Sequence, residues 1–95
     1  MQIVYLGFAG SAQLEAEAGV QLIRLERFGA WLDGCRLTVG ALDRGARFEA
    51  RLDLMLTRRA SVPMPCRVDV NPHVAIRLAF DTAERELHAT VNERA

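Results

Sequence analysis

The sequence predicts an α+β fold: a four-stranded mixed sheet with two helices packed on one face, in the order β-α-β-β-β-α. Short alternating apolar runs typical of strands, and two longer runs with apolar residues every three or four positions, indicate this class. Turns containing glycine or proline separate these runs. The chain has 95 residues, of which 51% are hydrophobic and 25% charged. Such a chain is expected to form one folded domain over residues 1–95.

The N-terminal part of the chain predicts a strand and then a helix. Apolar residues over 3–6 indicate the strand, and Ser11 is a suitable N-cap for a helix expected over 12–28. Gly29 follows as a stop signal. The apolar stripe of this helix consists of Leu14, Ala18, Leu22, Leu25 and Phe28. Gly19 inside it costs about 1 kcal/mol relative to alanine, and a close approach of helix to sheet would explain it.

The middle of the chain predicts a β-hairpin. Alternating residues over 35–41 form one arm, 43–45 form the turn, and 48–56 form the second arm. One face of the second arm is apolar and consists of Phe48, Ala50, Leu52, Leu54 and Leu56. The other face carries Arg47, Glu49, Arg51, Asp53 and Met55. A period of two sustained over this length is the clearest strand signal in the sequence.

A loop and a fourth strand are expected next. Two prolines and the pair Arg58-Arg59 predict a loop over 57–65. The strand over 66–70 alternates, and its members expected on the helix-free face of the sheet are Arg67 and Asp69. Its apolar members are Cys66, Val68 and Val70.

The C-terminal part predicts the second helix. Asn71 is a suitable cap, Pro72 fits the first helical position, and the helix is expected to reach about Asn92. Its apolar stripe consists of Ile76, Ala79, Phe80, Ala83, Leu87 and Val91. A helix between the first two strands allows them to be parallel neighbours through a right-handed crossover, with the later strands as a meander.

The charge balance argues against a strongly basic nucleic-acid binder. Twelve basic residues offset twelve acidic ones, and all the basic residues are arginine. A GC-rich coding background is the simpler explanation for the absence of lysine. Arginine nevertheless offers planar, forked contacts to phosphate.

Several other classes lack support in the sequence. No apolar stretch approaches the ~20 residues of a membrane span, and the start has no basic signal-peptide region, so a cytoplasmic protein is expected. Cys35 and Cys66 fit buried thiols better than a bridge, a metal pair or a nucleophile. His73 and His88 have no third ligand at a suitable spacing. No catalytic or phosphate-loop motif is present, so we expect no enzyme, cofactor or small-molecule substrate.

Three segments resemble a known family: Met1-Gln2-Ile3, residues 21–28, and Ala75-Ile76 followed by residues 83–87. With the predicted element order, the chain resembles a short form of the ribosome hibernation-promoting factors, also called the sigma-54 modulation or ribosome-associated inhibitor family, containing their N-terminal domain only. The resemblance implies a non-catalytic protein that binds the small ribosomal subunit under stress. There it would block the tRNA and mRNA channel and so inhibit translation.

The resemblance makes arginines the candidate rRNA-binding residues. Those on the helices, near positions where the family tends to be basic, are Arg24, Arg27, Arg77 and Arg85. Those predicted on the helix-free sheet face are Arg36, Arg47, Arg51 and Arg67. Helix-dipole compensation and cross-strand pairing with Glu49, Asp53 and Asp69 explain many of them without RNA.

Two alternatives share parts of this pattern. A protein-interaction or homodimerisation module of the same fold would use the apolar residues of the open sheet face, Val4, Leu6, Leu42 and Met55. A double-stranded-RNA-binding domain is the weaker alternative, because its α-β-β-β-α order lacks the first strand. Its basic start to the closing helix is also absent here.

Overall fold

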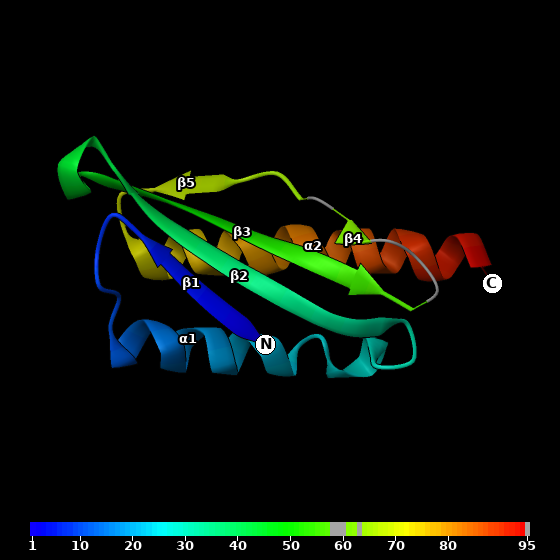
Figure 1. Ribbon diagram of the computed structural model, residues 1–95. Coiled ribbons are helices and arrows are strands. Elements are labelled where there is room, and N and C mark those ends of the chain that lie inside the picture. Colours follow the sequence, from blue (N-terminus) through cyan, green and yellow to red (C-terminus); the bar gives the residue numbers. More distant parts are fainter. Residues whose placement is uncertain (58–60, 63, 95) are drawn as a thin grey trace.

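The computed structural model describes residues 1–57, 61–62 and 64–94. The elements follow the predicted order (Figure 1). They are β1 (Gln2–Leu6), α1 (Ala12–Ile23), a 3₁₀ turn (Glu26–Phe28), β2 (Leu32–Leu42), a second 3₁₀ turn (Asp43–Gly45), β3 (Arg47–Leu56), β4 (Ser61–Val62), β5 (Arg67–Asp69) and α2 (Pro72–Arg94). The predicted α+β class is confirmed.

The sheet contains five strands arranged in four positions. β1 runs parallel to β2, and β2 runs antiparallel to β3. β4 and β5 both pair antiparallel with β3, β4 beside Leu54 and Met55 and β5 beside Phe48 to Ala50. The fourth position is therefore occupied by two short strands in place of one. The expected loop over 57–65 is wrong at Ser61–Val62, and Arg58-Arg59 lie outside the described residues.

Helix α1 begins as predicted and ends earlier. The Ser11 side chain accepts a hydrogen bond from the backbone N–H of Leu14 at 3.2 Å, which confirms the N-cap. From Arg24 onward the N–H groups bond to carbonyls three residues back, so the last part of the expected helix is tightened into 3₁₀ geometry. This geometry buries Leu25 and Phe28 in the core. Gly29 has φ −54°, so it is not the left-handed stop that was expected.

Both helices cover the same face of the sheet, and the core lies between them and the strands (Figure 1). The stripe of α2 is buried as predicted, with Val91 half-buried, and so are the inward residues of β2 and β3 apart from Ala41 and Phe48, which are half-buried. Asn71 caps α2, because its Oδ1 accepts from the backbone N–H of His73 at 2.9 Å. Gly19 is exposed with no atom within 4 Å of a Cβ built on it, so the expected close approach of α1 to the sheet is wrong.

The faces of β5 are reversed from the prediction. Arg67 stands opposite Ala50 and Asp69 opposite Phe48, so both share the helix-covered face of the inward residues of β3. Val68 stands opposite Glu49 on the other face and is 43% exposed. The short pairing of β5 with β3 sets this register. Burying Val68 and Val70 would require β5 to shift by one residue relative to β3.

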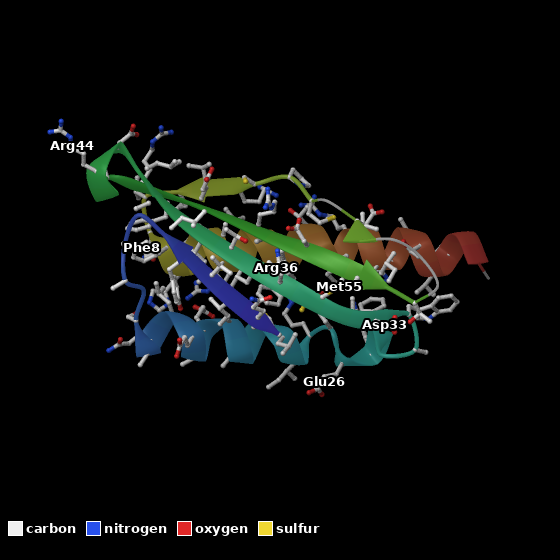
Figure 2. The ribbon with its side chains drawn as sticks, viewed as in Figure 1. Phe8, Glu26, Asp33, Arg36, Arg44 and Met55 are labelled. Carbon is white, nitrogen blue, oxygen red and sulfur yellow. The ribbon has the colours of Figure 1, made fainter. Side chains whose placement is uncertain are left out.

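The hairpin between β2 and β3 ends in three residues with left-handed backbone. Asp43, Arg44 and Gly45 have φ values of 50°, 57° and 91°. The turn confirms the predicted hairpin. It also carries the Arg44 side chain to the tip, where it projects away from the sheet (Figure 2).

Candidate functional site

Three arginines and three carboxylates connect α1 and the 3₁₀ turn that follows it to α2. The members of this interhelical ladder are Glu17, Arg24, Arg27, Arg77, Asp81 and Glu84. Contacts advance along both helices in the same direction, which shows that α1 and α2 run parallel. The formal charges of the ladder sum to zero. The helix arginines predicted to face rRNA are therefore largely committed to carboxylates of the same molecule.

Arg24 is the most heavily bonded side chain of the ladder. Its Nη2 donates to Asp81 Oδ1 at 2.7 Å, its Nε to Glu84 Oε2 at 3.0 Å, and its Nη1 to Gln21 Oε1 at 2.7 Å. Hydrogen bonding to Asp81, with a further contribution from Glu84, raises the pKa of Arg24 above its ordinary value. Because its donors are engaged on several sides, this guanidinium has little capacity left for a phosphate.

Arg27 shares Glu84 with Arg24 and also reaches a histidine. Its Nη2 lies 2.9 Å from Glu84 Oε1 and 2.7 Å from His88 Nε2. A guanidinium can only donate, so in this contact Nε2 of His88 is the acceptor. The Arg27 guanidinium also lies over the Phe28 ring at 4.8 Å from its centroid.

Glu17 anchors the other end of the ladder. Its side chain is 11% exposed and its Oε1 accepts from Arg77 at 2.9 Å, while Oε2 accepts from Gln21 at 3.1 Å. His73 Nδ1 lies 3.4 Å from the same carboxylate. Burial opposes ionisation of this group, but the hydrogen bonds from Arg77 and Gln21 outweigh it and lower the pKa of Glu17. The ion pair at this end is thus well formed.

Arg85 is the exception on the helices. It is exposed and makes no hydrogen bond or ion pair with the described part of the chain. Two hollows flank it. One, of about 410 Å³, is lined by Arg24, Asp81, Glu84, Arg85 and His88. The other, of about 390 Å³, is lined by Val62, Met64, Pro65, Thr82, Arg85 and Glu86.

The sheet arginines differ in how they are satisfied. Arg47 Nε donates to Asp43 Oδ2 at 2.6 Å and Arg51 Nε to Asp53 Oδ2 at 3.1 Å, in both cases along the chain and not across strands. Arg36 stands opposite Asp53 in register, yet it bonds to the Gln2 side chain at 3.3 Å. Arg36 lies on the helix-free face, as Figure 2 shows, without a carboxylate partner among the described residues.

Arg67 is wrongly placed by the sequence prediction. Its Nη1 donates to Thr82 Oγ1 of α2 at 2.9 Å, on the helix-covered side of the sheet. Arg67 therefore lies on the opposite side of the sheet from Arg36 and Arg51. The reason is the β5 register, which places Arg67 beside Ala50.

The four apolar residues predicted as an interface lie on the helix-free face but do not form one patch. Leu6 pairs with Gly40, close to Leu42 on β2, whereas Met55 pairs with Gly34 at the far end of that strand. Eight residues of extended strand separate these ends, about 26 Å. Val68 and Val70, which are 43% and 71% exposed, are apolar surface residues that the sequence reading missed.

The two cysteines are both free thiols, but Cys66 is exposed, so the expectation of a buried thiol is wrong at that position. Desolvation raises the pKa of Cys35, which is buried. Desolvation and then the nearby Glu49 carboxylate raise the pKa of Cys66. Both effects disfavour the thiolate, the nucleophilic form. Among the described residues, no three His, Cys, Asp or Glu side chains lie together as a metal-binding group would.

The spacing of charged residues in the sequence is the pattern from which the ladder could be predicted. Arg24 and Arg27 are three residues apart on one predicted helix, and Asp81 and Glu84 have the same spacing on the other. Matching charges at equal spacing indicate pairing once two helices are known to be parallel neighbours.

No family model matches the chain, and no curated protein matches its sequence. Among solved structures, the chain is similar to the crystal structure of the Protein Y N-terminal domain from Thermus thermophilus. The TM-score is 0.72 at 17% identity, over 90% of this chain and 91% of that one. At this identity the similarity shows the fold alone. None of the described helices is long and apolar enough to cross a membrane.

Proposed function

We propose that this chain is a non-catalytic, cytoplasmic protein that binds the small ribosomal subunit and occludes its tRNA and mRNA channel. The observation that carries the proposal is the backbone similarity to the Protein Y N-terminal domain, which extends over nine-tenths of both chains. The three segments that resemble hibernation factors support the same function. Such a protein acts by occupying space, and no catalytic residue is needed.

The ladder limits which arginines serve this function. Arg24, Arg27 and Arg77 are held by carboxylates of their own molecule. Of the predicted residues, Arg36, Arg67 and Arg85 have no carboxylate partner in the described part. Arg67 is held by Thr82 on the helix-covered side of the sheet, which leaves Arg36 and Arg85, and Arg44 at the exposed hairpin tip joins them. Three such phosphate contacts predict a log-log salt slope of about −2 to −3, whereas all eight predicted arginines would give about −6 to −7.

Co-sedimentation with vacant small subunits across a salt series tests this proposal. We expect binding at low salt with the shallow slope. Replacing the three unpaired arginines (Arg36→Gln, Arg44→Gln and Arg85→Gln) should abolish binding. A control with the same loss of charge replaces the bonded sheet arginines (Arg47→Gln, Arg51→Gln and Arg67→Gln) and should weaken binding much less. Equal losses in the two triple variants would contradict the assignment, and absence of binding at low salt would contradict the function.

A protein-interaction module is the second candidate. Two observations favour it. The apolar side chains of Leu6, Val68 and Val70 are exposed, and the net charge of the ladder is zero. This candidate predicts no binding to vacant subunits at any salt concentration, so the same experiment separates the two.

A further inference from the structure

The outer edge of β1 has no strand beside it in the described structure. β1 pairs with β2 alone, and Figure 1 shows it at the margin of the sheet. Proteins usually protect such edges with charges, proline or a bulge. Gln2–Leu6 has the sequence QIVYL and contains none of these. Its outward backbone groups are therefore available to another extended strand.

The exposed surface of α1 next to the outer edge of β1 carries no charged residue at its centre. One side of α1 is directed at α2 by the ladder, and another is buried on the sheet through Leu14 and Ala18. The remaining exposed side carries Ala12, Ala16, Gly19, Val20 and Ile23. Val20 and Ile23 are 61% and 62% exposed. Gly19 lowers helix stability without any close contact within the monomer.

We propose that this flank is a homodimer interface in which β1 pairs antiparallel with β1 of a second copy. A two-fold axis at Val4 would set Gln2 opposite Leu6 of the second copy, and Ile3 opposite its Tyr5. Since β1 contains no charged residue, it pairs with itself without like charges facing each other.

Strand and helix spacings agree with this arrangement. Two helices cover four strand positions within the domain, so each helix spans about two strands, or roughly 10 Å. Joining two sheets through β1 repeats this spacing between the two α1 helices. It matches the distance of about 8–10 Å between packed helices. Helices at the short end of that range need small residues in contact, as at Ala16 and Gly19.

A second copy fits the flank better than an extended peptide. A peptide would satisfy the edge of β1 but leave Gly19 and Ile23 exposed, whereas a symmetric partner covers both the strand edge and this side of the helix. Glu15 on α1 and Glu26 in the following 3₁₀ turn are exposed and are the acidic groups that a partner's α1 would approach. This inference is separate from the proposed function, because it uses neither ribosome nor arginine.

Sedimentation equilibrium from micromolar concentrations to ~1 mM, on the native chain and on Gly19→Glu, tests the interface. We expect the native chain to reach about twice the 10.6 kDa of one chain. Gly19→Glu should stay monomeric and folded, since Gly19 has open space around it. Gln13→Glu makes the same charge change at another exposed position of α1 and should still dimerise.

Amide hydrogen exchange provides the second readout. Outward amides of β1 should exchange more slowly as the native chain dimerises. A native chain that remains monomeric to ~1 mM overturns the proposal. So does a Gly19→Glu protein that dimerises as well as the native one. A dimer whose β1 amides exchange at the monomer rate would also overturn it, and would point to the open sheet face.

Discussion

Arg24 and Arg27 both donate to Glu84, and Arg24 also donates to Asp81. These bonds compete with any phosphate for the same N–H groups, so the carboxylates of α2 set how much positive charge the helices can present. Arginine offers five donors in a fixed fork, and a carboxylate satisfies them in much the same geometry as a phosphate. If the chain binds rRNA as proposed, the acidic residues of α2 are therefore as important to binding as the arginines.

Removing those carboxylates should strengthen binding to the small subunit. In the double variant Asp81→Asn and Glu84→Gln, Arg24 and Arg27 become available, and the salt slope should steepen by about 1 to 2. Co-sedimentation across a salt series measures this. The double variant Glu26→Gln and Glu86→Gln removes the same two charges away from the ladder and serves as control. An equal gain in both would show that net charge, and not release of the ladder, is responsible.

Glu17 makes the stability of the fold depend on pH. Its pKa is lowered in the folded protein, so its contribution is fully present above its usual value of about 4.5 and is lost as the pH falls through the folded value. Glu17→Gln should lower the free energy of unfolding by about 1 to 2 kcal/mol near pH 7. The difference from the native chain should shrink near pH 3.

Urea unfolding followed by the fluorescence of Trp31, the single tryptophan, measures that difference. Glu26→Gln, at an exposed carboxylate, should change stability by no more than about 0.5 kcal/mol at either pH. A Glu17 effect that does not change with pH would contradict the ion pair with Arg77.

At the level of elements, periodicity predicted the long segments well and the short ones poorly. β3 and α2 each have many residues on their buried face, so no single position decides which face is buried. β5 is three residues long at the edge of the sheet, and its register with β3 reversed the expected faces. The early end of α1 also depends on tertiary packing, because 3₁₀ bonding turns Leu25 and Phe28 into the core.

Substitutions on the two faces of β3 test which face points into the core. Leu52→Asp would bury an unpaired charge at a fully buried position and should unfold the domain, at a cost of about 4 kcal/mol or more. Met55→Asp makes the same kind of change on the outward face, where the side chain is 43% exposed, and should leave the domain folded. Circular dichroism and thermal melting compare the two. A folded Leu52→Asp protein with an unfolded Met55→Asp protein would mean that the faces are reversed.

For the whole molecule, the sequence identified the fold and part of the candidate surface. Alternation along β2 and β3 correctly placed Arg36, Arg47 and Arg51 on the helix-free face. The pairing of helix arginines with carboxylates could not be predicted from either helix alone, because it depends on how α1 and α2 are aligned along their axes. That alignment follows from the packing of both helices on the sheet, which no local pattern encodes.

In the proposed function, the chain occupies the tRNA and mRNA channel of the small subunit. Competition tests it most directly: co-sedimentation of the chain with vacant subunits is compared with subunits preloaded with mRNA and tRNA, at one low salt concentration. We expect binding to vacant subunits and loss of binding to loaded ones. Equal binding to both would place the chain elsewhere on the ribosome, and binding to neither would contradict ribosome association itself.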